Sequence, residues 1–319
     1  MSVYTPISDD EFSEILKSYG LGKFISSRGI EAGIENTNYF ITTSKDEYVF
    51  TLFEKLSKDE VYFYISLLQE LSAAGIACPQ PQINLQQHAV SEIKSKPFTL
   101  VSRLAGKNVS VVNTEQCKAI ATELAKFHST IFSNSNPANP LLQNRRGKAW
   151  REKTANELLT KLSAEDVTLI TSELTLYESF DDSKLPKGII HADLFPDNAL
   201  FVGNQLSGII DFYDACYDNY LYDVAITFNA WCSNDAGELN QALATAFLES
   251  YQRIRPFSHD EDQAWPIMLR MAAMRFWLSR LEADLVKNSA LNGEGILTQA
   301  KNPAQYRKIL ENYTQSAVN

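Results

Sequence analysis

The chain has 319 residues, of which 45% are hydrophobic and 21% are charged, a composition typical of a globular protein with one large domain or two lobes. Its formal net charge of −10 and pI near 5.0 argue against nucleic acid or an anionic membrane surface as a partner, because such partners select for clustered Lys and Arg. Any phosphate group must therefore be bound by local groups, namely a metal ion, backbone N–H groups or single basic residues.

The N-terminal sequence and the cysteines favour a cytoplasmic protein. Residues 1–10 contain neither the basic region nor the apolar run of a signal peptide, and no apolar run is long enough to span a bilayer. The four cysteines lie far apart and include no Cys-x-x-Cys pair, so we expect reduced thiols at Cys78, Cys117, Cys216 and Cys232.

The first hundred residues predict a small lobe of strands and helices. Ser8 and Glu11 form a capping box for a helix that closes at Gly20. We expect antiparallel strands at 24–26, 38–42 and 48–53, a helix at 58–74, an extended segment around Pro79 and Pro81, and a buried strand at 97–102.

The rest of the chain is mainly helical in pattern. Helices are expected at 114–132, 150–162, 164–180 and 267–285, and short apolar runs at 189–190, 199–202 and 206–210 predict strands between them. The sequence therefore predicts an α+β protein with a lobe of residues 1–103 and a larger, mostly helical lobe of residues 104–319.

Four polar residues follow the short strands at a spacing known from kinases. His191-x-Asp193-x-x-x-x-Asn198 matches a kinase catalytic loop, and Asp211 stands where a metal-binding Asp is expected. Phosphoryl transfer needs an anionic group beside the attacking hydroxyl and oxygen ligands for hard cations. Asp193 is suited to accept the proton of the hydroxyl, His191 to support the loop, and Asn198 and Asp211 to ligate Mg²⁺. The competing interpretation is that Asp and Asn merely occupy turns, which both residues favour.

At these residues the sequence resembles the aminoglycoside phosphotransferase and choline kinase superfamily, which shares the protein-kinase fold. The resemblance covers nearly the whole chain. Within the superfamily it is most similar to the homoserine kinases, on the segments Glu35 to Tyr39, Tyr48 to Glu54, His191 to Asn198, Ile209 to Cys216 and Arg275 to Leu281. It implies transfer of the γ-phosphoryl group of ATP, with Mg²⁺, to the hydroxyl of L-homoserine in threonine biosynthesis.

The resemblance also implies nucleotide-binding residues in the small lobe. A strand-turn-strand at 29–38 would cover the phosphates, with Gly33, Asn36, Thr37 and Asn38 near them, and the backbone near Ser102 and Leu104 would bind adenine. The third strand carries Thr51 where related kinases have Lys or Arg. Lys55, four residues later, falls on the same strand face by the two-residue period, and Glu60 opens the next helix. Lys55 is either a phosphate ligand or a solvated surface lysine.

An amino acid acceptor needs partners for its carboxylate and its ammonium group. Arg270, Arg275 and Arg280 lie in a strongly apolar helix, where a charge is costly unless it is paired. Arg275 or Arg280 is suited to grip a carboxylate, although an internal salt bridge explains such arginines equally well. Tyr213, Asp214 and Asp218 follow the expected metal ligand, and one of these acids can receive the ammonium group. Asp223 is expected to buttress the catalytic loop, while Trp231 and His128 are expected in the core.

Two other functions stay open on the residues alone. An aminoglycoside, choline or a sugar can replace homoserine as acceptor, and Asp214, Asp218, Asp235 and Glu238 can line an acidic pocket for it. A kinase-like module that binds nucleotide without catalysis is the third possibility, supported only by Thr51. We expect a small-molecule partner, no nucleic acid or membrane, and a monomer or homodimer.

Overall fold

The computed structural model of the protein describes residues 3–30, 36–133, 135–290 and 301–316. By packing, the chain forms two compact units, Met1–Lys107 with Leu200–Tyr213, and Asn108–Ala199 with Asp214–Asn319. The boundary predicted from the sequence lies between residues 103 and 104. In the structure the first unit runs on to Lys107 and also takes in a second segment from the middle of the chain.

The first unit contains a five-stranded antiparallel sheet in the order β1-β2-β3-β5-β4. Its strands are β1 (Phe24–Gly29), β2 (Thr37–Thr43), β3 (Glu47–Leu52), β4 (Ser91–Ile93) and β5 (Lys96–Ser102). The antiparallel arrangement of the first three strands is confirmed. The extended segment at Pro79 and Pro81 is no strand but makes an isolated bridge, Pro81 to Val101, and the fifth strand of the sheet is β4 instead.

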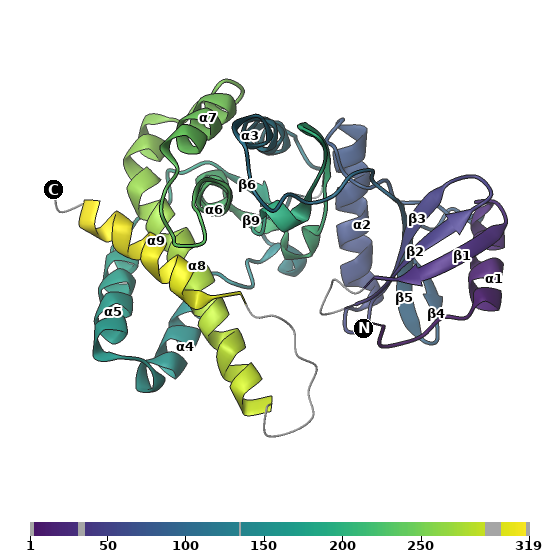
Figure 1. Ribbon diagram of the computed structural model, residues 1–319, viewed down its shortest axis with the longest axis horizontal. Helices are drawn as coiled ribbons and strands as arrows, with labels where there is room; N and C mark the ends of the chain where they lie inside the picture. Colours follow the sequence, from purple (N-terminus) through teal and green to yellow (C-terminus); the bar gives the residue numbers. More distant parts are fainter. Residues whose placement is uncertain (1–2, 31–35, 134, 291–300, 317–319) are drawn as a thin grey trace. The chain divides into compact units, whose positions relative to one another are not determined.

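Helix α1 (Asp9–Tyr19) covers this sheet, as Figure 1 shows beside β1. The predicted capping box is present, since Ser8 Oγ accepts from the N–H of Glu11 and the Glu11 carboxylate accepts from the N–H of Ser8. Its buried apolar side chains join those of the strands in one core: Phe12, Leu16, Ile41, Phe50, Leu52 and Leu100 are fully buried. Helix α2 (Lys58–Ala73) begins at a second capping box, Ser57 with Glu60.

The hairpin of β7 (Ala199–Val202) and β8 (Gln205–Ile209) reaches into the first unit. Lys107 and Phe201 form an isolated bridge, and the N–H of Ile209 donates to Ala77 O over 2.8 Å. The residues that follow β8 are therefore positioned by the first unit, although they come from the middle of the chain.

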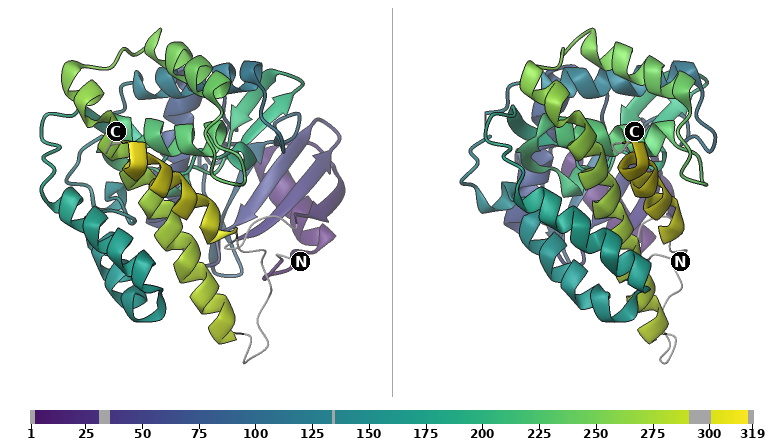
Figure 2. Two further views of the ribbon diagram at one scale, coloured as in Figure 1. Left: turned by 60° about the vertical axis from the view of Figure 1, so that its left-hand side comes forward. Right: turned by 90° about the vertical axis from the view of Figure 1, so that its left-hand side faces the viewer.

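The second unit is mainly helical around a two-stranded sheet of β6 (Lys187–Ile190) and β9 (Cys216–Asn219). Helix α8 (His259–Ala290) is the longest of the described helices, and α4, α5, α6 and α9 all contact it; Figure 2 shows α9, in yellow, beside it. The helices are α3 (Thr114–His128), α4 (Lys148–Leu158), α5 (Ala164–Glu178), α6 (Tyr220–Cys232), α7 (Gln241–Gln252), α8 (His259–Ala290) and α9 (Pro303–Ser316), with 3₁₀ turns η1 (Pro140–Leu142), η2 (Leu159–Lys161), η3 (Pro196–Asn198) and η4 (Phe212–Asp214).

The structure confirms the α+β class and shortens two expected helices. The helix expected to reach Phe132 ends at His128, because the N–H of Ser129 caps the carbonyls of the last turn. The helix expected to reach Leu162 leaves α geometry after Leu158 and closes as η2. All four cysteines are buried free thiols, as expected.

Candidate active site

One buried carboxylate fixes the loop that connects β6 to η3. The N–H groups of His191 and Ala192 donate to the two oxygens of Asp223, each over 2.8 Å. Ala192 has φ 64°, a left-handed conformation that is costly for a residue with a Cβ and persists only where the surroundings impose it. Asp223 on α6 is fully buried and imposes it. The expectation that Asp223 supports the catalytic loop is confirmed.

Asp223 is itself held by His128 and Tyr251. His128 Nε2 lies 3.0 Å from Asp223 Oδ2, and His128 Nδ1 lies 2.8 Å from the hydroxyl of Tyr251. Burial lowers the pKa of His128 despite the neighbouring carboxylate, so the ring is neutral, donating from Nε2 and accepting at Nδ1. Burial alone would raise the pKa of Asp223, but the hydrogen bonds from His128 and His191 hold that pKa below its ordinary value.

Asp193 lies at the centre of this loop, with 29% of its side chain exposed. Asn198 Nδ2 donates to the Asp193 carbonyl over 2.8 Å and to its carboxylate over 3.2 Å. His191 is fully buried, and its Nδ1 accepts from the N–H of Asp193 over 3.2 Å. That His191 supports catalysis in this way stays a prediction. Trp231 is core, as expected, but its indole N–H also donates to Leu194 O over 3.0 Å.

The side chain of Asn198 is oriented with its nitrogen toward Asp193. Within the part of the chain that the structure describes, no residue donates a hydrogen bond to Asn198 Oδ1. An amide oxygen left in this way is a ligand of the kind that hard divalent cations take. Asn198 therefore fits the metal-binding role that the sequence predicts for it.

Asp211 belongs to the first unit, directly after β8. It is exposed and has φ 65°, an unusual conformation for Asp that turns its backbone sharply out of the strand. Tyr213 follows in η4, where its ring packs edge-on against Phe53 and Tyr64. Burial raises the pKa of the Tyr213 hydroxyl, which interacts with Thr51. Tyr213 thus has a packing role in the first unit.

The residues expected near the nucleotide phosphates differ in their contacts. Gly33 lies outside the described residues. The hydroxyl of Thr37 is fully engaged, since it donates to Glu54 over 2.6 Å and accepts from the N–H groups of Tyr4 and Thr5. Asn38 Nδ2 donates to the carbonyl of Asn36 over 3.3 Å, and Asn38 Oδ1 accepts from Thr51 over 2.8 Å. Phosphate contact by Asn36, Thr37 and Asn38, through side chain or backbone, stays a prediction.

The placement of Lys55 on the third strand is wrong. β3 ends at Leu52, and Lys55 lies exposed in the bend before α2, so the two-residue strand period does not apply to it. Glu60 caps α2 through Ser57, over 2.9 Å to its N–H and 2.8 Å to its hydroxyl. Thr51 is buried, and its hydroxyl donates a hydrogen bond to Asn38. The position of the usual strand lysine is therefore occupied by a residue that packs within the sheet.

The expected adenine-binding backbone follows β5. The N–H of Ser102 donates to Gln80 O over 2.9 Å, and Ser102 Oγ accepts from the N–H of Gln80. Among the described residues, none accepts a hydrogen bond from the N–H of Leu104. Gly106 has φ 86°, and a Cβ there would lie 2.2 Å from Phe201 O, so only Gly allows the chain to pass this close to β7.

The residues expected at the acceptor divide into three groups. Asp218 lies in β9, where it accepts from Asn144 Nδ2 over 2.6 Å, and burial raises its pKa. Arg280 Nη1 donates to Asn302 O and Gln305 Oε1 over 2.7 and 2.8 Å, which ties α8 to α9. Arg275 alone reaches the catalytic loop, with Nη1 3.5 Å from Asp193 and Nη2 4.0 Å from Asp214. The structure therefore brings together Asp193, Asn198, Arg275 and Asp214.

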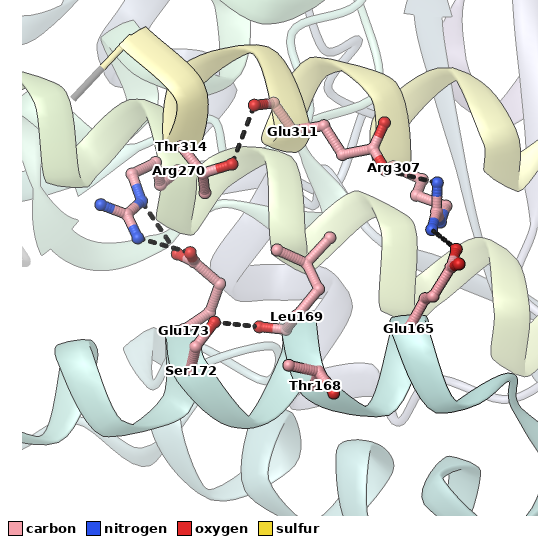
Figure 3. Close-up of a pocket in the computed structure, with 9 residues that line it drawn as sticks. All are labelled: Glu165, Thr168, Leu169, Ser172, Glu173, Arg270, Arg307, Glu311 and Thr314. Carbon is pink, nitrogen blue, oxygen red and sulfur yellow. Dashed lines mark hydrogen bonds and ion pairs between the residues drawn. The ribbon is translucent and has the colours of Figure 1, made fainter. Parts of the chain in front are cut away.

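A separate hollow of about 720 Å³ lies between α5, α8 and α9. Figure 3 shows Arg270 joined to Glu173 at one end and Arg307 joined to Glu165 and Glu311 at the other. None of the predicted catalytic or metal-binding residues lines it. Sequence reasoning gave no indication of this hollow, because its walls come from three segments far apart in the chain.

The chain is similar to known phosphotransferases by sequence and by structure. Residues 26–257 match the Phosphotransferase enzyme family. The chain is 43% identical over 311 residues to the homoserine kinase of Methylobacillus flagellatus, covering 98% of this chain and 95% of the relative. It is 39% identical to the homoserine kinase of Neisseria meningitidis serogroup B, covering 97% of this chain and 99% of the relative.

Solved structures show the same fold at low identity. A spectinomycin phosphotransferase in complex with ADP and spectinomycin has a TM-score of 0.69 at 16% identity, covering 96% of this chain and 95% of that one. An amicoumacin kinase with AMP-PNP and Ca²⁺ has a TM-score of 0.67 at 16% identity, covering 95% and 93%. Among the described helices, none has both the length and the apolar character needed to cross a membrane. The chain belongs to the phosphotransferase enzyme family, in the group whose curated members are named homoserine kinase.

Proposed function

We propose that this protein transfers the γ-phosphoryl group of ATP to the side-chain hydroxyl of L-homoserine, with Mg²⁺ as the cation. The observation that carries the proposal is the set of contacts made by Asp193. Asp193 lies in the loop with kinase spacing, accepts hydrogen bonds from Asn198 and lies beside Arg275 of α8. The names of the relatives, at 36% to 43% identity over nearly the full chain, supply the acceptor.

The residues of the chain perform the reaction as follows. Asp193 accepts a hydrogen bond from the hydroxyl of the acceptor and takes its proton. At the same time the hydroxyl oxygen bonds to the γ-phosphorus, and the bond between that phosphorus and the bridging oxygen breaks, so that ADP leaves. Asp223 keeps the loop in the conformation that presents Asp193. Bound Mg²⁺ would neutralise charge on the phosphate oxygens, with Asn198 Oδ1 and the Asp211 carboxylate as its protein ligands. The N–H of Leu104 is suited to bind the adenine edge.

The proposal is tested by following ADP release with ATP, Mg²⁺ and a panel of acceptors. Turnover with L-homoserine above the blank is expected, with little or none for choline, a sugar or an aminoglycoside. Turnover with one of these and none with homoserine would refute the acceptor assignment. Asp193→Asn should lower kcat by about 10²- to 10⁴-fold, because it removes the proton acceptor while keeping the shape of the side chain.

A protein that binds nucleotide but phosphorylates no acceptor would support the non-catalytic alternative. The matched control is Asp197→Asn, in the same loop. The Asp197 carboxylate pairs with Lys301 over 2.6 Å and, among the described residues, forms no ion pair with Arg275. Asp197→Asn is expected to retain activity. Equal losses in the two variants would mean that the loop as a whole, rather than Asp193, carries the effect.

A further inference from the structure

Helix α8 carries three arginines, and their contacts differ in kind. Arg270 makes a two-pronged hydrogen bond to the fully buried Glu173, through Nε over 3.1 Å and Nη2 over 2.5 Å. Arg280 donates to two oxygens on the segment that leads into α9. These two arginines each donate two hydrogen bonds to internal partners, which gives them a structural role.

Arg275 is the most deeply buried of the three, with 4% of the residue exposed, but its contacts are longer than theirs. Its two carboxylate neighbours lie 3.5 and 4.0 Å away, whereas a charge-assisted hydrogen bond from a guanidinium is about 2.7 to 2.9 Å long. In the described part of the chain, no N–H group of Arg275 donates a hydrogen bond at normal geometry. A buried guanidinium left this way keeps donors available for a further oxygen ligand.

The surroundings of Arg275 strengthen its attraction for an anion. The Phe276 ring centroid lies 3.7 Å from Arg275 Cζ, and the rings of Phe195 and Tyr306 pack against Phe276 edge-on and tilted, with centroids 4.6 and 5.3 Å away. This aromatic cover keeps water from one face of the guanidinium and lowers the local dielectric. A carboxylate bound to this guanidinium would therefore be held more tightly than at an exposed arginine.

We infer that Arg275 binds the α-carboxylate of the acceptor and that Asp214 receives its ammonium group, so that the site selects hydroxylated α-amino acids. The inference rests on the proposed function and names the residues that recognise its substrate class. Asp214 is suited to the second role because 44% of its side chain is exposed and its nearest described cation is Arg275, at 4.0 Å.

The size of the acceptor fits this arrangement. In an extended four-carbon hydroxy amino acid, the hydroxyl and the carboxylate are about 5 Å apart by standard bond lengths. The hydroxyl can therefore reach Asp193 while the carboxylate reaches Arg275, because the two side chains are 3.5 Å apart at their nearest atoms. The same guanidinium then faces the catalytic carboxylate and the substrate carboxylate, and fixes the distance between the hydroxyl and its proton acceptor.

Acceptors that each lack one charged group test the inference. 3-Aminopropan-1-ol lacks the carboxylate and 4-hydroxybutyrate lacks the ammonium group. Arg275→Gln should lower kcat/KM for L-homoserine about 10²- to 10³-fold and change kcat/KM for 3-aminopropan-1-ol by less than about threefold. Equal losses for both acceptors would overturn the inference, because they would show that Arg275 acts only on Asp193.

Competition by L-2-aminobutyrate provides a measurement that does not depend on turnover of a poor acceptor. This compound keeps the carboxylate and the ammonium group of homoserine but has no hydroxyl to phosphorylate. Its inhibition constant should rise about 100-fold in Arg275→Gln and less in Arg275→Lys, which keeps the charge without the fork. An unchanged inhibition constant in Arg275→Gln would also overturn the inference.

Arg270→Gln is the matched control, on the same helix and with the same change of side chain. It should lower Tm, because the buried Glu173 loses its cationic partner, and leave the preference for homoserine over 3-aminopropan-1-ol unchanged. Asp214→Asn should selectively reduce the preference for homoserine over 4-hydroxybutyrate. If the wild type does not phosphorylate homoserine, the proposed function fails; if it does and Arg275→Gln keeps the preference, only the inference fails.

Discussion

Asp223 and His128 form a buried hydrogen-bonded pair whose protonation is tied to folding. The pKa of His128 is lowered by burial, so the unfolded chain binds a proton at a higher pH than the folded protein does. The stability contributed by neutral His128 is thus fully present above the unfolded pKa of about 6.5 and is lost as pH falls through the folded pKa. The pKa of Asp223 is also lowered, so its contribution is lost only in more acid solution, below about 3.9.

We therefore predict that the free energy of unfolding falls between about pH 7 and pH 5, measured by urea unfolding at each pH. His128→Gln should flatten this slope, because Gln can donate to Asp223 and accept from Tyr251 without titrating. The same slope in the variant and the wild type would assign the pH dependence to other groups. His88, which shares no contact with Asp223, provides the control substitution His88→Gln.

Tyr306 and Tyr251 are both buried, but their hydroxyl groups differ in whether they are hydrogen-bonded. Within the described ranges, the hydroxyl of Tyr306 has no partner, whereas that of Tyr251 contacts His128 over 2.8 Å and Arg255 over 3.3 Å. Tyr306→Phe should leave Tm unchanged or raise the stability by about 1 kcal/mol, since it removes an unsatisfied buried group. Tyr251→Phe should cost about 1–3 kcal/mol, because it leaves His128 Nδ1 without a donor. Thermal unfolding of both variants distinguishes these effects.

At the scale of elements, the approach of the segment after β5 to β7 depends on one glycine. Gly106→Ala adds a Cβ 2.2 Å from Phe201 O and also disfavours φ 86°. We expect a loss of at least about 2 kcal/mol of stability and a higher KM for ATP, because the displaced segment carries Leu104. Gly203 has φ 62° and open space around an added Cβ, so Gly203→Ala should cost only about 1 kcal/mol of stability. Equal effects of the two substitutions on KM would refute a role for this close approach.

At the scale of the whole molecule, the expected cation ligands are divided between the packing units. Asn198 belongs to the second unit and Asp211 to the first. Asn198→Ala and Asp211→Asn should each raise the Mg²⁺ concentration needed for half-maximal activity, while EDTA should stop turnover reversibly. If both residues ligate one ion, the double variant should be less impaired than the sum of the single effects, by about 1 kcal/mol or more. Additive effects would indicate that the two residues act on different ions.

The sequence alone determined the features that depend on neighbours in the chain. The capping box of Ser8 with Glu11 depends on local hydrogen bonds. The spacing of His191, Asp193 and Asn198 after a short apolar run is also a local feature, although the conformation of their loop depends on Asp223. The helical and strand periods located most elements to within a few residues. Lys55 was misplaced because the end of β3 is set by pairing with β5, which no local period encodes.

Only the tertiary structure decided how each polar residue is paired. Arg270, Arg275 and Arg280 follow one another at intervals of five residues in one apolar helix, and the sequence predicts only that each needs a partner. The partners of Arg270 and Arg275 lie on α5 and on the loop of Asp193 with η4, far from α8 in the chain, whereas those of Arg280 lie at the start of α9, 22 and 25 residues away. Long-range packing selects these partners, because a buried charge is stable only where the fold brings an opposite charge or hydrogen-bonding group to it. The same reason explains why His128 meets Asp223, 95 residues away.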